Sequence, residues 1–120
     1  MKRRILIIED NEQNLYLLTF LLVKNGYEVD SATDGPSGIV RATASPPDLI
    51  LLDIQLPGMD GYAVAQALKK VATLVAVPIV AVTSYAMPGD KEKALESGCT
   101  GYIEKPINPE TFLAQMEGYS

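Results

Sequence analysis

Acidic residues directly follow two short apolar runs of this chain. Asp53 closes the run at 49–52. Glu9 and Asp10 close the run at 5–8. Short apolar runs of this kind are typical of buried parallel strands, and open α/β sheets keep their sites at the carboxyl ends of such strands. If the two strands are neighbours, three carboxylates meet on one rim of the sheet.

Two further apolar runs end in groups that suit the same rim. The run at 78–82 ends in the hydroxyl of Thr83, and the run at 101–104 is followed by the amine of Lys105. Three carboxylates, one hydroxyl and one ammonium fit a divalent cation together with a phosphoryl group. A carboxylate is a competent nucleophile for phosphoryl transfer, so we assign Asp53 this role.

The acidic residues predict a magnesium site. Clustered carboxylates repel one another, which raises at least one pKa unless a cation lies among them. Magnesium prefers oxygen ligands and keeps several waters. We expect Asp10 and Asp53 to bind it directly and Glu9 to act through water. The backbone carbonyl of Gln55 is the expected fourth contributor. The absence of histidine and the remoteness of Cys99 disfavour zinc and copper.

The basic and hydroxyl groups predict how the phosphoryl group is held. Phosphoryl transfer spreads negative charge over three oxygens, which Lys105 neutralises and to which Thr83 and the Ser84 amide donate hydrogen bonds. Lys105–Pro106 is a candidate cis peptide, which would aim the lysine inward. Taken singly, each of these residues also has a purely structural explanation, as a turn cap, a solvated acid, a strand-end hydroxyl or a surface amine. Their joint occurrence at four strand ends favours a functional site.

The elements that must position these groups alternate between short apolar runs and longer amphipathic ones, a pattern of βα units. Strands are predicted near 4–9, 27–32, 48–53, 78–83 and 101–104, and helices near 12–25, 36–44, 61–71, 87–98 and 109–118. We expect caps at Asn11, Asp60 and Asn108, and a left-handed helix end at Gly26. The segment 34–36 is expected to open the second helix, with its proline in the first turn.

Five βα units with right-handed crossovers form an α/β, doubly wound, five-stranded parallel sheet, (βα)5. The pattern alone leaves the strand order open. The flavodoxin-like order 2-1-3-4-5 makes the first and third strands neighbours and so brings Glu9, Asp10 and Asp53 together.

Composition narrows the functional classes. A chain of 120 residues is one domain, 1–120, and its net charge of −5 argues against nucleic acid as a direct partner. The only basic cluster, at 2–4, is expected to be a solvated lead-in to the first strand. No segment is long and apolar enough to span a membrane, and a single cysteine permits no internal disulfide, so we expect a cytoplasmic protein. The lack of histidine excludes His-based triads.

The chain resembles the receiver domain of bacterial two-component response regulators over essentially its whole length. The motifs that carry the likeness are 8–11 (IEDN), 52–61 (LDIQLPGMDG), 82–86 (VTSYA) and Lys105–Pro106. The resemblance implies Asp53 as phosphoacceptor, magnesium as cofactor, a phosphohistidine donor and the order 2-1-3-4-5. Asn11 and Asn14 are similar to a variant found in hybrid-kinase receivers and small stand-alone regulators.

The resemblance also implies a switch. In such receivers phosphorylation pulls the strand-4 hydroxyl, here Thr83, inward, and an aromatic residue on strand 5, here Tyr102, follows it. The readout face would be helix 4, strand 5 and helix 5. Gln55 and Tyr85 flank the path of water to Asp53, so bulky Tyr85 is expected to slow hydrolysis. Faster decay of the phosphorylated form in Tyr85→Ala would support this idea, and unchanged or slower decay would remove it.

We therefore expect a stand-alone phosphorelay switch that catalyses its own phosphorylation and slow dephosphorylation and is not a metabolic enzyme. Its partners would be a histidine kinase or histidine phosphotransfer protein and a downstream protein target. Three alternative functions fit the residues less well. A flavin- or nucleotide-binding module needs a Gly- or Ser/Thr-rich phosphate loop where this chain has acids. An aspartate-nucleophile phosphatase would carry Asp-x-Asp after the first strand. A pseudo-receiver adaptor would lack the intact acceptor set.

Overall fold

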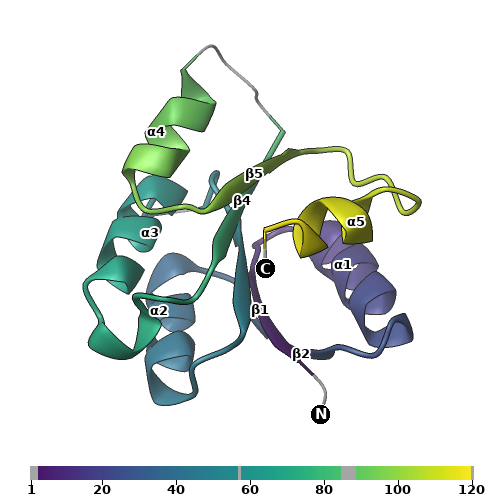
Figure 1. Ribbon diagram of the computed structural model, residues 1–120, viewed down its shortest axis with the longest axis horizontal. Helices are drawn as coiled ribbons and strands as arrows, with labels where there is room; N and C mark the ends of the chain where they lie inside the picture. The colour runs from purple at the N-terminus through teal and green to yellow at the C-terminus, as the bar shows by residue number, and fades with distance from the viewer. Residues whose placement is uncertain (1–2, 57, 85–88, 120) are drawn as a thin grey trace.

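The computed structural model describes residues 3–56, 58–84 and 89–119 (Figure 1). The elements in chain order are β1 (Arg4–Ile8), α1 (Glu12–Lys24), β2 (Glu28–Ala32), α2 (Gly35–Ala44), β3 (Leu49–Asp53), α3 (Gly61–Lys69), the 3₁₀ helix η1 (Ala72–Leu74), β4 (Ile79–Thr83), α4 (Asp90–Glu96), β5 (Gly101–Glu104) and α5 (Phe112–Glu117). Strands and helices alternate, as the pattern of apolar runs predicted.

The five strands form one parallel sheet in the order β2-β1-β3-β4-β5. This confirms both the fold class and the flavodoxin-like order. Every residue of β3 and of β4 is buried, which explains why these strands are continuous apolar runs without alternation. Because all five strands are parallel, their carboxyl ends lie along the same rim of the sheet.

Helices cover both faces of the sheet. Figure 1 shows α2, α3 and α4 on one side and α1 with α5 on the other. Successive strand residues point to opposite faces, so the sheet feeds two separate cores. The first core contains Leu6, Ile8, Ile50, Leu52, Val64, Leu68, Ala81 and Ala94 among its buried members. The second contains Ile5, Ile7, Leu18, Leu22, Leu51, Val80, Val82, Phe112 and Met116.

The predicted helix starts at α1, α2 and α3 are present. The side chain of Asn11 accepts a hydrogen bond from Asn14 N at 2.9 Å. Asp34 and Asp60 cap α2 and α3 in the same manner. Gly26, just beyond α1, has φ +89°, the left-handed conformation that favours glycine at this position. These caps satisfy backbone N–H groups that have no partner within their own helix.

The prediction for helix 5 was wrong at its start. The helix was expected near 109–118 with Asn108 as its cap, but α5 begins at Phe112 and its N-cap is Thr111. Asn108 instead organises a turn, since its side chain accepts from Glu110 N and its carbonyl accepts from Thr111 N and Phe112 N. An Asx-type turn and a helix cap compete for the same side-chain oxygen, and the turn won here.

Two other helix boundaries differ from the expected ranges. α3 ends at Lys69 and not near 71, because Lys70 N and Val71 N bond to carbonyls three residues back and tighten the last turn. α4 runs from Asp90 to Glu96, and the expected start near 87 lies outside the described residues. Within the part of the chain that the structure describes, no helix combines the length and apolar character that crossing a membrane requires.

Candidate functional site

Three carboxylates gather where β1 and β3 end. β1 pairs with β3 so that Ile8 lies opposite Leu52, which makes the residues that follow them neighbours. One carboxylate oxygen each from Glu9, Asp10 and Asp53 lies within 4.8 Å of the other two. Glu9 and Asp53 are buried, whereas Asp10 is exposed. The strand order thus brings together the acids that the sequence placed at separate strand ends.

Backbone hydrogen bonds between neighbouring strands extend past the ends of β1 and β3 and hold these acids in place. Glu9 N donates to the carbonyl of Ala32 on β2 at 3.0 Å. Ile54 N donates to the carbonyl of Val82 on β4 at 3.1 Å, which anchors the chain immediately after Asp53. Backbone hydrogen bonds therefore restrain the chain on both sides of the rim.

Lys105 joins the acidic cluster from the end of β5. Its Nζ lies 2.8 Å from Glu9 Oε1 and 3.6 Å from Asp53 Oδ2. The lysine side chain is only 10% exposed, so its charge needs these partners. The sequence predicts that Lys105 binds a phosphoryl group, but it does not predict the ion pair between Lys105 and Glu9. The only signal for it was that an acid and an amine both end strands on the same rim.

The Asp53 carboxylate is held from two sides. Its Oδ1 accepts a hydrogen bond from Gln55 N at 2.9 Å, while its Oδ2 faces Lys105. Gln55 itself is exposed. A carboxylate restrained in this way presents its oxygens in a defined direction, which a nucleophile requires.

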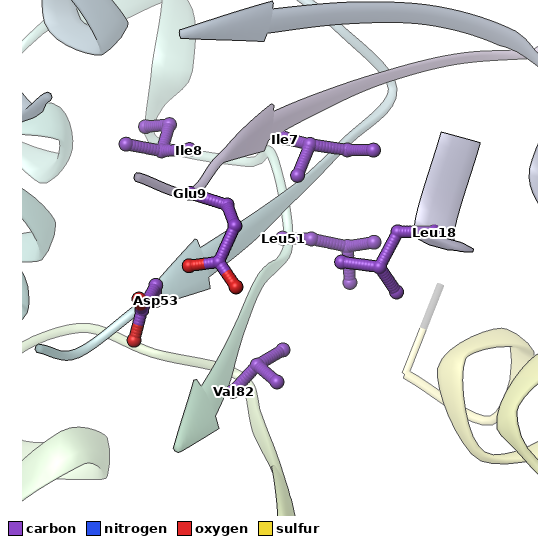
Figure 2. Close-up of a pocket in the computed structure, with 7 residues that line it drawn as sticks. All are labelled: Ile7, Ile8, Glu9, Leu18, Leu51, Asp53 and Val82. Atoms are coloured by element: carbon purple, nitrogen blue, oxygen red, sulfur yellow. The ribbon is translucent and has the colours of Figure 1, made fainter. Parts of the chain in front are cut away.

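Glu9 borders a small pocket whose other walls are mostly apolar. Figure 2 shows the Glu9 carboxylate extending toward Asp53, with the apolar side chains of Leu51, Leu18 and Val82 lining the same pocket. The pKa of Glu9 is raised to about 7, first by burial and next by the adjacent Asp53 carboxylate, while Lys105 opposes the shift. Glu9 Oε2 is buried without a hydrogen-bond partner among the described residues.

The hydroxyl groups lie at the ends of the neighbouring strands. Thr83 is the buried last residue of β4, and its carbonyl accepts from Lys105 N at 2.7 Å. Ser84 follows and is exposed. The Lys105–Pro106 peptide bond is cis. Tyr85 lies outside the described residues.

Tyr102, the residue expected to act in the switch, lies on β5. Its side chain is half-buried, and its hydroxyl is buried with no hydrogen-bond partner in the ranges 3–56, 58–84 and 89–119. Burial raises the pKa of Tyr102, and the charges of Asp90 and Glu104 raise it further. The tyrosine is therefore a neutral phenol at physiological pH.

The comparisons with known proteins agree with this geometry. The response regulator receiver domain family matches residues 5–117. The polar-differentiation response regulator DivK of Brucella ovis is 40% identical over 119 residues, which cover 99% of this chain and 97% of that protein. The chain therefore belongs to the response regulator receiver domain family, whose members act in phosphorelay signalling by two-component systems.

Solved structures show the same fold. Chemotaxis protein CheY4 of Vibrio cholerae is 28% identical and superposes with a TM-score of 0.95, with all of both chains covered. The receiver domain of a sensor histidine kinase from Pseudomonas aeruginosa PAO1 is 30% identical, with a TM-score of 0.90 and coverage of 99% and 98%. In that structure a magnesium ion is coordinated in the active site cleft.

Proposed function

We propose that Asp53 accepts a phosphoryl group from the phosphohistidine of a histidine kinase or histidine phosphotransfer protein, and that the phosphorylated chain signals by changed partner binding. One observation carries this proposal: a restrained carboxylate lies 3.6 Å from the Lys105 ammonium inside a cluster of three acids. Family membership supports the same reading.

The acidic cluster suits magnesium. All three side chains offer hard oxygen ligands, and Glu9 Oε2 has no hydrogen-bond partner among the described residues. Asp10, Asp53 and the backbone carbonyl of Gln55 would hold the ion, with Glu9 acting through water. When bound, magnesium supplies positive charge that offsets the repulsion between the acids and the phosphoryl oxygens.

The residues of this chain supply the rest of the chemistry. An Asp53 carboxylate oxygen attacks the donor phosphorus; the P–N bond to the donor imidazole breaks, and its electron pair stays on the ring nitrogen. Lys105 neutralises charge on the transferring group. The Thr83 hydroxyl and the Ser84 amide donate hydrogen bonds to its oxygens.

The signalling step follows from differential binding. A phosphoryl group on Asp53 binds the Thr83 hydroxyl better in one conformer, so it favours that conformer by the difference in binding free energy. Tyr102 then moves with Thr83, since both lie on the paired strands β4 and β5. The altered face, made of α4, β5 and α5, would bind the downstream target.

The proposed activity is a single turnover on the chain itself and not metabolic catalysis. The lifetime of the phosphorylated form depends on the access of water to Asp53. We infer that Gln55 and Tyr85 limit that access and so set the phosphoryl lifetime.

Incubation with acetyl phosphate and magnesium, followed by intact mass analysis, tests the proposal. Wild type is expected to gain one base-labile phosphoryl group, because acyl phosphates hydrolyse in base. Asp53→Asn is expected to gain none, whereas Asp30→Asn, a change on β2 away from the rim, should react like wild type. Removal of magnesium with a chelator should abolish labelling of wild type. Equal labelling of Asp53→Asn would refute the proposal.

A further inference from the structure

Helix α1 is apolar on two faces. One face packs its leucines into the second core. The other face leaves the side chains of Tyr16, Phe20 and Val23 exposed to solvent by 73%, 56% and 52% in the order Tyr16, Val23, Phe20. A helix at the surface of a protein normally carries polar residues on the side turned away from the core. A contiguous group of large exposed apolar side chains therefore indicates an interaction surface.

These side chains border a shallow hollow on the outside of α1. The hollow has a volume of about 330 Å³, and the described residues that line it are Tyr16, Thr19, Phe20, Val23 and Lys24. All five belong to α1, which together with α5 forms the outer layer on this side of the sheet (Figure 1). Because no other described element contributes a wall, the side chains that fill the hollow would come from another molecule.

Four exposed residues of α1 form a ridge whose order of chemical groups is complementary to its own reverse. Glu12, Tyr16, Phe20 and Lys24 are spaced four residues apart, so they follow one i±4 row over about 18 Å of helix. The row begins with an acid and ends with a base, and two aromatic rings lie between them. Lys24 Nζ lies 5.7 Å from the centroid of the Phe20 ring, so the ammonium extends along the row. Neither Glu12 nor Lys24 forms an ion pair with a residue that the structure describes.

We propose that this ridge of α1 packs antiparallel against the same ridge of a second copy of the chain and so forms a symmetric dimer. A two-fold axis places each Glu12 beside Lys24 of the other copy. Each Tyr16 then lies beside Phe20 of the other copy. A two-fold contact uses every pair twice, so two ion pairs flank a cluster of four aromatic rings. Rows of this kind interdigitate when two helices cross at about 50°.

The pattern favours a second copy over an unrelated partner. An apolar helix of any protein could cover the aromatic rings, but only a partner with the same row in reverse matches both charged ends. Charges of these signs also favour the dipole of α1 itself, because the acid lies in its first turn and the base in its last. Mixing of charge-reversed variants separates that local role from pairing between copies.

This inference goes beyond the proposed function, since no residue of the phosphoryl site takes part in the contact. Glu12 is not a member of the acidic cluster, and α4 lies on the opposite side of the sheet from α1 (Figure 1). Dimerisation should therefore be the same with and without magnesium and needs no phosphoryl donor.

Sedimentation velocity at increasing protein concentration tests the dimer. An interface of one helix per copy buries less than about 1,200 Å², so association should be weak, with wild type half dimeric at roughly 10–500 µM. Phe20→Glu brings like charges together at the centre of the contact and should leave the protein monomeric throughout this range. Val40→Glu is the matched control: this valine on α2 is 67% exposed, and the variant should dimerise like wild type.

Reversal of the end charges tests the antiparallel register. Glu12→Lys and Lys24→Glu each bring like charges together at both ends, so each variant alone should dimerise about five- to tenfold more weakly than wild type. An equal mixture of the two variants pairs opposite charges again and should regain the wild-type affinity. Circular dichroism verifies that each variant is folded.

Three results would overturn the inference. The first is a wild type that stays monomeric over the whole range, which would leave this face of α1 to a partner of different sequence. The second is a dimer that Phe20→Glu does not weaken. The third is a mixture of the charge-reversed variants that associates no more strongly than either variant alone.

Discussion

At the scale of single residues, Glu9 has the most unfavourable surroundings in the site. It is buried between Lys105 and Asp53, and one of its oxygens lacks a partner among the described residues. Desolvation costs a charged carboxylate more than one ion pair at 2.8 Å returns, which is why its pKa rises despite the adjacent lysine. The proposed cation would offset this cost.

The raised pKa predicts a pH dependence of stability. The pKa of Glu9 rises from an ordinary 4.5 to about 7, so between these values the folded state binds more protons than the unfolded state. The free energy of unfolding of the metal-free protein should therefore fall as pH rises through this window. Glu9→Gln should remove this contribution, which we place at about 1–3 kcal/mol. Denaturant titrations below and above the window, without magnesium, measure it; an unchanged pH dependence in the variant would contradict it.

Lys105 is predicted to matter more for chemistry than for folding. Lys105→Met removes the charge next to Asp53 and should slow phosphorylation by acetyl phosphate at least about tenfold, as loss of a charge-stabilising group generally does. The protein should still fold, because Glu9 can take up a proton once the Lys105 ammonium that pairs with it has been removed. Lys70→Met, at an exposed position after α3, serves as the control for general effects of losing a lysine. A wild-type rate in Lys105→Met would contradict this role.

At the scale of elements, the start of α3 packs tightly against the chain that leaves the site. A Cβ on Gly61 would overlap the Cα of Ile54 and lie 2.8 Å from the carbonyl oxygen of Asp53. Both neighbours are backbone atoms, which cannot move aside like a flexible side chain. Glycine at position 61 therefore lets the start of α3 approach the chain at 53–54 closely. Across this contact, Gly61 N donates a hydrogen bond to Ile54 O at 2.9 Å.

Gly61→Ala should accordingly lower the free energy of unfolding by about 1–3 kcal/mol, as overpacking of a rigid site does. The Asp53 carbonyl would be displaced, so phosphorylation should slow as well. Gly118→Ala is the control, because a Cβ there meets its nearest atom only at 3.4 Å. Thermal unfolding of both variants gives the comparison, and equal midpoints would show that the contact relaxes freely.

At the scale of the whole molecule, the sheet is a platform between two cores and the site lies on its rim. The helices α2, α3 and α4 cover one core, and α1 with α5 cover the other (Figure 1). The rim residues come from β1, β3, β4 and β5, so a ligand that binds them links four strands at once. Binding of such a ligand would therefore stabilise the folded state relative to the unfolded chain.

Magnesium, held by residues at the ends of β1 and β3, should stabilise the folded protein against unfolding. A ligand that binds only the folded state adds about 2.7 kcal/mol when its concentration is a hundredfold above its dissociation constant. The thermal midpoint should rise steadily with magnesium concentration in wild type and much less in Asp10→Asn. Sodium chloride at matched ionic strength controls for screening. An identical rise in both proteins would show that the effect does not come from the acidic cluster.

Much of this architecture could be predicted locally. Apolar runs and their flanking turn residues indicate strands and helices, since burial and capping depend on residues close in sequence, and Asn11 and Asp60 cap helices as expected. The start of α5 could not be predicted, because Asn108 can serve either a turn or a cap. The choice depends on where the following apolar residues dock, and Phe112 is fully buried in the second core.

The order of amino acids specifies which chemical groups end the strands: two acids after β1, one at the end of β3, a hydroxyl on β4 and an amine after β5. Tertiary structure alone decided how these groups meet. Strand order is a choice between distant partners, and local periodicity carries no information about it. The order β2-β1-β3-β4-β5 placed the acids within 4.8 Å of one another and paired Lys105 with Glu9.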